Sequence, residues 1–123
     1  MDSRKDTTFR TTVPGFERDH EAFDINERAI IDRYMNRFES DYQNSIIDMD
    51  LRSSYNKEVH VTHPYKLWQI YLTRNYRAFV LFRKDRPEAY WIALFRKGKQ
   101  REQKEIEVAK ARASEFWNSM KGR

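Results

Sequence analysis

The chain reads Lys66-Leu-Trp-Gln-Ile-Tyr-Leu-Thr73, then Tyr76-Arg-Ala-Phe-Val-Leu-Phe-Arg83, then Glu88-Ala-Tyr-Trp-Ile-Ala-Leu-Phe95. Each run is rich in β-branched and aromatic residues, as strands are, and short polar segments separate the runs. The dipeptide Arg74-Asn75 is short enough for a tight hairpin, and Pro87 in the second connection lies outside the strand ladder. Residues 66–95 are therefore predicted to form a three-strand antiparallel meander.

Helical periodicity flanks the meander on both sides. Upstream, Asp24-x-x-Glu27 has the spacing of a capping box. Residues 24–49 are expected to be helical, as one long helix or as two, because Ser40-x-x-Gln43 could cap a second helix. Downstream, one helical face gathers apolar residues and predicts a helix over 102–120. The residues of that face are Ile106, Ala109, Ala113, Phe116 and Met120.

The remaining segments carry weaker signals. Residues 1–6 are expected to fray, and residues 7–13 alternate as a short strand would, before a turn at Pro14-Gly15. Residues 50–65 lose the helical period and read as a loop that ends at His63-Pro64. Taken together, the patterns predict a single α+β domain over 1–123. Its N-terminal helix or helical hairpin and its C-terminal helix would pack on a small antiparallel sheet.

Composition limits the chemistry that the chain can perform. It contains no Cys, which excludes disulfides, thiolate catalysis and Cys-based zinc sites. It has no apolar run near the roughly 20 residues that span a bilayer, and no apolar core of a signal peptide near its N-terminus. We expect a cytoplasmic protein that uses no cofactor and no membrane partner.

Charge is distributed unevenly along the chain. Residues 1–65 carry 9 Lys and Arg against 13 Asp and Glu, whereas residues 66–123 carry 15 against 6. A one-sided positive field favours polyanions, of which nucleic acid is the commonest for a soluble protein. The alternative is that these cations simply solvate the surface of a small domain.

Four pieces of residues 66–112 carry a family resemblance. They are Leu67-Trp-Gln-Ile70, Tyr76-Arg77, Phe95-Arg-Lys-Gly-Lys-Gln-Arg101 and Glu105-Ile-x-x-Ala109-x-x-Arg112. In this order the chain resembles the RelE/ParE superfamily of toxin–antitoxin toxins, and its HigB-like branch most of all. Three features depart from that pattern: Tyr71 stands where the family usually has Arg, no Thr-Pro precedes the last helix, and the N-terminal half carries no family motif.

The resemblance implies a type II toxin that cleaves mRNA, free or on the ribosome, and that a cognate antitoxin protein inhibits. Such endoribonucleases use the ribose 2′-hydroxyl to attack the adjacent phosphate, which needs a base, an acid and a cation but no metal. Arg77 matches the family's Tyr-Arg motif and is the candidate cation, since a guanidinium can bind a phosphate with two parallel hydrogen bonds. The alternative for Arg77 is an exposed strand residue that lies over aromatic neighbours.

Other candidate site residues follow from residue chemistry and from the same resemblance. His60, His63 and Tyr76 are candidates for proton transfer, and two loop histidines are too few for a metal site. Basic residues at the start and end of the meander are candidates for binding flanking phosphates, or else a solvated turn. They are Lys66, Arg96, Lys97, Lys99 and Arg101.

Two other functions stay open at this point. A ParE-like toxin that poisons DNA gyrase would keep the fold and explain the poor supply of acids and bases. A non-enzymatic RNA-binding module would need only the charge and the aromatic residues.

Overall fold

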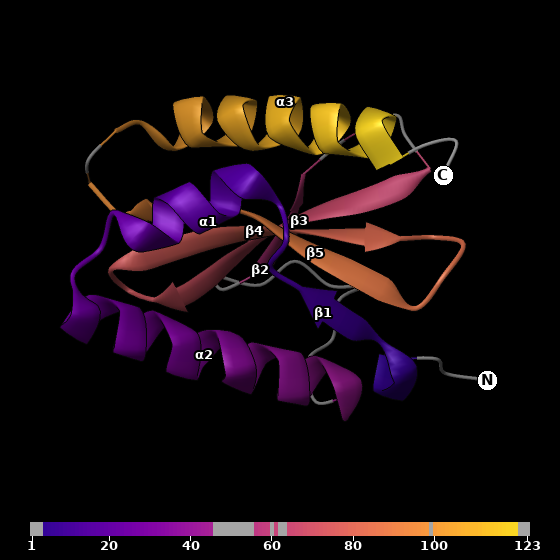
Figure 1. The fold of residues 1–123 in the computed structure, drawn as a ribbon, viewed down its shortest axis with the longest axis horizontal. Coiled ribbons are helices and arrows are strands. Elements are labelled where there is room, and N and C mark those ends of the chain that lie inside the picture. Colours follow the sequence, from indigo (N-terminus) through magenta and orange to yellow (C-terminus); the bar gives the residue numbers. More distant parts are fainter. Residues whose placement is uncertain (1–3, 46–55, 60, 62–63, 99, 121–123) are drawn as a thin grey trace.

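The predicted meander forms the centre of the sheet. In the computed structural model, which describes residues 4–45, 56–59, 61, 64–98 and 100–120, the central strands are β3 (Tyr65–Thr73), β4 (Tyr76–Arg83) and β5 (Glu88–Arg96). They pair as antiparallel neighbours, with one register shift between Tyr71 and Thr73 and another at Phe79 and Val80. The predicted α+β class is confirmed (Figure 1).

Two further strands extend the sheet at its edges. β1 (Thr8–Arg10) pairs in parallel with β5, and β2 (Asn56–Val59) pairs antiparallel with β3, giving the order β1-β5-β4-β3-β2. The sheet is therefore mixed rather than purely antiparallel. β2 lies in the segment that was expected to be a loop. The sequence did not indicate this strand, because Val59 is its only apolar residue and its strand character comes from pairing with β3.

Helices follow the first strand. α1 (Pro14–Glu21) begins where a turn was expected, because Pro suits the first position of a helix, where its missing N–H is not needed. α2 (Ile25–Gln43) has the predicted capping box, in which the Glu27 amide donates to Asp24 Oδ1 at 2.8 Å. No second helix begins at Ser40, and residues 46–49 of the predicted helical segment lie outside the described residues. Arg4–Asp6, which were expected to fray, form the 3-10 helix η1.

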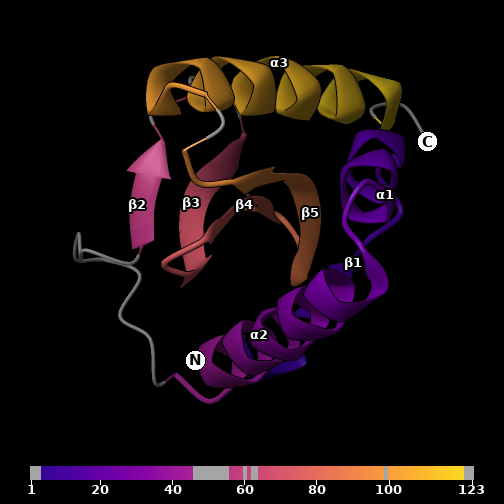
Figure 2. The same cartoon turned by 90° about the vertical axis from the view of Figure 1, so that its left-hand side faces the viewer.

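Helices cover both faces of the sheet. α3 (Glu102–Met120) lies across one face, α2 lies across the other, and α1 lies beside β5 (Figures 1 and 2). Both faces are consequently buried, and Phe79, Trp91 and Ile92 are each 0% exposed. Among the described helices, none combines the length and apolar character needed to cross a membrane.

Candidate nucleic-acid interface

Arg77 lies inside the molecule, beneath α3. Its side chain is 7% exposed, and it faces the fully buried carboxylate of Glu105. Arg77 Nη2 donates to Glu105 Oε2 at 3.0 Å, and Arg77 Nε lies 2.9 Å from Glu105 Oε1. Glu102 adds a second carboxylate, whose Oε2 is 3.7 Å from Arg77 Nη1. The guanidinium that was predicted to bind a phosphate is thus bound by two acids of the same chain.

The pKa shifts of Arg77 and Glu105 are those of a buried ion pair. Burial lowers the pKa of Arg77, but the hydrogen bond and charge of Glu105 outweigh burial and raise it. Burial raises the pKa of Glu105, and the Arg77 guanidinium partly offsets this effect. The geometry is that of a side-on ion pair, in which each charge is the main compensation for the other. Arg77 therefore adds little to the positive field outside the molecule.

Tyr76 and Arg96 also have acidic and aromatic partners within the chain, although Arg96 is partly exposed. The Tyr76 hydroxyl donates to Glu27 Oε1 at 3.2 Å, and Arg96 forms an ion pair with the same carboxylate. The Arg96 guanidinium lies over the rings of Phe23, at 5.3 Å, and Tyr76, at 5.8 Å. Burial and the neighbouring Glu27 raise the pKa of Tyr76, so its hydroxyl is harder to ionise than in water. Both residues fasten the start of α2 to the sheet.

The remaining candidates do not form one cluster. Lys97 and Arg101 are exposed at the end of β5, whereas Lys66 is exposed at the start of β3. Arg96 pairs with Tyr76, and Lys66 pairs with Phe82, so the two groups are separated by about 20 Å along β4 at about 3.3 Å per residue. Lys66 therefore lies at the opposite end of the sheet from the cations it was predicted to join. His60, His63 and Lys99 lie outside the described residues.

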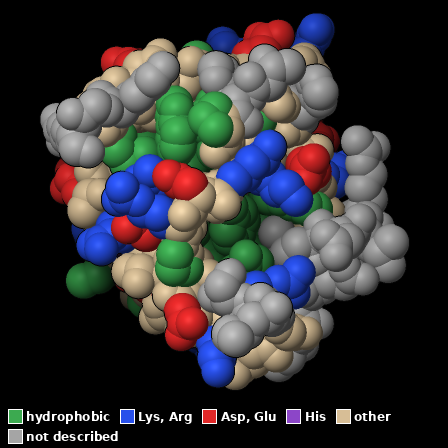
Figure 3. All heavy atoms as spheres, turned by 90° about the vertical axis from the view of Figure 1, so that its right-hand side faces the viewer, with side chains coloured by type: hydrophobic (Ala, Val, Ile, Leu, Met, Phe, Trp, Pro, Cys, Tyr) green, Lys and Arg blue, Asp and Glu red, His purple; other side chains and the backbone are tan. Residues whose placement is uncertain are grey.

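Lys66 instead lines a hollow with cations that the sequence did not single out. The hollow has a volume of about 310 Å³, and we call it the basic–aromatic pocket. Its cationic residues are Arg4, Lys66, Arg83 and Lys84. Its aromatic residues are Tyr42, Trp68 and Phe82. Figure 3 shows on this side of the molecule a hollow with hydrophobic side chains at its base and Lys and Arg side chains around it.

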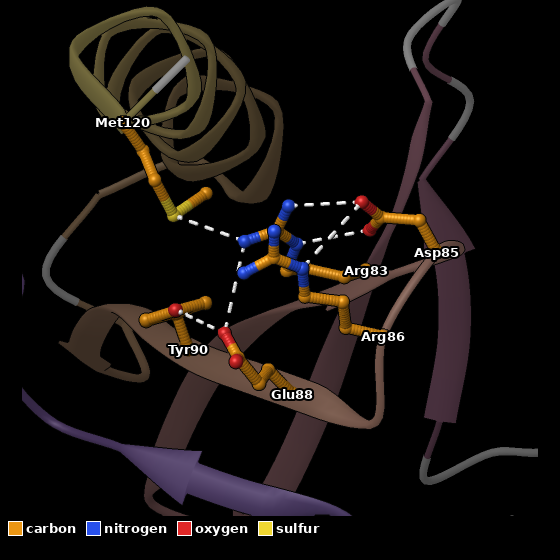
Figure 4. Close-up of polar contacts among 6 residues, drawn as sticks. All are labelled: Arg83, Asp85, Arg86, Glu88, Tyr90 and Met120. Carbon is orange, nitrogen blue, oxygen red and sulfur yellow. Dashed lines mark hydrogen bonds and ion pairs between the residues drawn. The ribbon is translucent and has the colours of Figure 1, made fainter. Parts of the chain in front are cut away.

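Arg83 is the fixed cation of the pocket. Its Nε and Nη2 donate to the two carboxylate oxygens of Asp85, each at 3.0 Å (Figure 4). Its Nη1 lies 3.7 Å from Glu88 and donates to the Met120 sulfur at 3.6 Å. Arg83 also stacks over the Trp117 ring at 5.2 Å. These contacts hold the turn between β4 and β5 against the end of α3, and Asp85 compensates the Arg83 charge.

Lys66 and Lys84 are the available cations of the pocket. Both are exposed, and neither forms an ion pair with any residue in the described ranges. Lys66 precedes Trp68 by two residues on β3, and because alternate strand residues share a face, the two side chains lie on the same side of the sheet. Lys84 comes directly after the end of β4 and lines the same pocket. Their charges are free to attract a polyanion.

Several features of this site were hidden in the sequence. Lys84 and Arg4 were not predicted because they lie in segments read as a turn and a frayed end. Lys84 could have been predicted, because the hairpin at Arg74-Asn75 places the end of β4 beside the start of β3, where Lys66 lies.

Comparisons with protein-family models, with curated proteins and with solved structures find no match to this chain. Within the described part of the chain, no three His, Cys, Asp or Glu side chains gather as a metal site would require. The candidate interface is therefore inferred from the charges and the shape of this chain alone.

Proposed function

We propose that this chain is a toxin of the RelE/ParE kind that acts on mRNA in the cytoplasm and binds the RNA through the basic–aromatic pocket. The observation that carries the proposal is the lining of this pocket, in which four cationic side chains surround three aromatic ones and, among the residues that the structure describes, no acidic side chain takes part. Cations neutralise RNA phosphates, and aromatic rings stack on unpaired bases, so the lining suits both parts of a nucleotide.

The fold supports the same proposal. The order of a helical segment, an antiparallel meander and a terminal helix, in which the sequence resembles the RelE/ParE superfamily, is the order that the chain has. The basic residues of 66–123 outnumber the acidic ones by 15 to 6, and Lys66 and Lys84 both belong to that half. Long-range attraction of RNA would therefore favour the half of the chain that contributes these two ammonium groups.

Endoribonuclease activity is the reaction we propose for the bound RNA. Attack of a 2′-hydroxyl on a phosphate concentrates negative charge, and we assign Lys66 and Lys84, rather than Arg77, to compensate it. Arg77 is less suited because Glu105 already occupies its guanidinium. His60 and His63 remain the candidates for proton transfer and are tested by substitution with Gln.

The test is induced expression of matched double variants. K66A/K84A removes two cations from the pocket, and K97A/R101A removes two exposed cations from the other end of the sheet, so the net charge is equal. We expect growth arrest, with new mRNA 5′ ends mapped by primer extension, for the wild type and K97A/R101A but not for K66A/K84A. The reverse pattern would favour the cations at the end of β5, and equal arrest by both variants would contradict the pocket.

One alternative keeps the toxin and changes its target. The burial of Arg77 against Glu105 removes the expected catalytic cation, and this observation supports a ParE-like gyrase poison as the second candidate. Growth arrest without mRNA cuts, together with inhibition of DNA supercoiling by the purified chain, would establish that alternative. An antitoxin is the proposed partner in both cases, and an acidic segment that covers the pocket would suit its charge. Harmless expression of the wild type would leave only an RNA-binding module.

A further inference from the structure

We propose that the basic–aromatic pocket holds one unpaired nucleotide, with the base against the aromatic residues and the phosphate between Lys66 and Lys84. This inference rests on the proposed function, because it names the form of RNA that the same site would take. It predicts that single-stranded RNA binds and that a duplex does not.

The size of the pocket supports a single nucleotide. Its volume of about 310 Å³ is near the lower end of the range of about 300–1,000 Å³ that small-molecule sites occupy. A duplex keeps its bases stacked inside and presents mainly phosphates and 2′-hydroxyls, so it has no planar group to place in such a hollow. A nucleotide that is not stacked in a duplex can supply one.

The order of chemical groups in the pocket matches the order in a nucleotide. Trp68 and Phe82 are 3% and 7% exposed, so only small parts of their rings reach the hollow, and the partly exposed Tyr42 offers the larger ring surface. Lys66 and Lys84 are exposed at the rim. A nucleotide likewise has a planar, weakly hydrated base at one end and a charged phosphate at the other. Free phosphate would use only the rim, so the aromatic base of the pocket favours the nucleotide over the ion.

The walls of the pocket are already in place. The rings of Tyr42 and Phe82 lie 4.8 Å apart at 31°, and Phe9 meets Phe82 edge to face at 6.0 Å. The Arg4 guanidinium lies over the Tyr42 ring at 5.1 Å, and Asp85 fixes Arg83 through two hydrogen bonds. Side chains that are ordered before binding lose little further entropy when a ligand arrives. A small ligand therefore has a preformed site in this hollow.

The experiment is titration of the purified full chain, followed by amide chemical shifts and by calorimetry. The probes are 5′-UMP, uridine, inorganic phosphate, a short oligouridylate and an RNA duplex of equal length. We expect 5′-UMP to bind more tightly than uridine or phosphate, and the oligouridylate more tightly than the duplex. In K66A/K84A the affinity for 5′-UMP should fall by about tenfold or more, since two charged contacts are lost. In K97A/R101A the affinity for 5′-UMP should change by less than about twofold. The end of β5 lies about 20 Å from Lys66 along β4, which exceeds the distance over which salt screens exposed charges.

A second variant separates stacking from charge. Y42L removes a partly exposed ring at the edge of the pocket, and it should weaken 5′-UMP while leaving inorganic phosphate unchanged. Phosphate that binds as tightly as 5′-UMP, a duplex that competes equally, or affinity for 5′-UMP that survives K66A/K84A would each overturn the inference. Growth arrest without nucleotide binding would overturn this inference and leave the toxin standing. Nucleotide binding without growth arrest would support this inference and contradict the toxin.

Discussion

Arg77 of β4 and Glu105 of α3 form a buried ion pair that attaches the last helix to the centre of the sheet. The Glu105 side chain is 0% exposed and the Arg77 side chain 7% exposed, and two contacts of 2.9 and 3.0 Å join them. Tyr71 and Lys57 extend the contact through Glu102, at 3.2 and 3.8 Å respectively. A substitution at Arg77 therefore acts first on stability, whatever its effect on activity.

We expect R77A to lower the free energy of unfolding by about 3–5 kcal/mol, because it leaves the Glu105 carboxylate buried without its cation. Urea denaturation followed by circular dichroism measures the change. R77M/E105L, which removes both charges, should recover most of the loss. A loss of less than about 1 kcal/mol in R77A, the size expected for a surface ion pair, would mean that water reaches Glu105.

The carboxylate of Glu39 should make stability depend on pH. It accepts a hydrogen bond from Trp91 Nε1 at 2.8 Å, and burial raises its pKa above 4.5 while that hydrogen bond partly opposes the rise. A raised pKa means that the folded state holds the proton more tightly. This contribution to stability is therefore present below about pH 4.5 and is lost as the pH rises through the folded pKa.

We accordingly expect the stability of the wild type to fall relative to E39Q as the pH is raised from 4 to 7. Gln keeps an oxygen that can accept from Trp91 but does not titrate. Chemical denaturation at several pH values measures the difference. E107Q, at an exposed position of α3, serves as the control. A difference between wild type and E39Q that stays constant over this range would show that Glu39 has its ordinary pKa.

Gly15 is expected to resist substitution although it lies in a helix. A Cβ at Gly15 would lie 2.6 Å from Arg112 Cδ and 2.7 Å from Arg112 Cζ. Arg112 cannot easily move, because its Nη1 donates to Asp19 Oδ2 at 2.7 Å and to the Ile92 carbonyl at 3.0 Å. G15A should therefore destabilise the protein by about 1–3 kcal/mol, as overpacking does.

The measurement is thermal or urea unfolding of G15A in two backgrounds. Ala is intrinsically better than Gly in a helix by about 1 kcal/mol. In the R112A background, where the obstructing side chain is absent, the same substitution should therefore be stabilising. Destabilisation of equal size in both backgrounds would assign the effect to something other than Arg112.

Salt should weaken RNA binding through Lys66 and Lys84. Each phosphate contact on a single strand contributes about 0.7 to the slope of log affinity against log salt concentration. K66A/K84A should therefore reduce the slope for oligouridylate by about 0.7, because the two lysines share one phosphate. Fluorescence anisotropy over a salt series measures it. An unchanged slope in K66A/K84A, beside a reduced slope in K97A/R101A, would place the phosphates at the end of β5 instead.

The central strands and the two long helices could be read from the sequence because their signals are local. Strand composition, the Arg74-Asn75 turn and the capping box at Asp24 each depend on neighbouring residues. The parallel pairing of β1 depends on β5, far along the chain, and no local pattern encodes it. β2 has little strand character of its own and depends on its pairing with β3. Pro14-Gly15 gave a correct boundary but the wrong element, because Pro can open a helix as well as a turn.

The site was harder to predict for a related reason. Glu105 shares a stripe with Ala109 and Ala113, and all three are buried against the sheet. An acid on a buried stripe needs a cationic partner, and this signal could have removed Arg77 from the surface. The pocket also depends on register: counting back from the turn pairs Lys66 with Arg83, but the shift near Tyr71 pairs it with Phe82. A shift of one residue changes which side chains share a face, and the sequence does not mark the shift.

The parallel pairing of β1 with β5 also constrains synthesis. Thr8 pairs with Glu88 and Arg10 with Tyr90, so the first strand has no partner until most of the chain has been translated. During that time β1 is an unpaired strand on a nascent chain, and such strands are prone to wrong pairing. If translation stops before residue 88, β1 has no strand to pair with. The β1 edge of the sheet forms only after β5 has been translated.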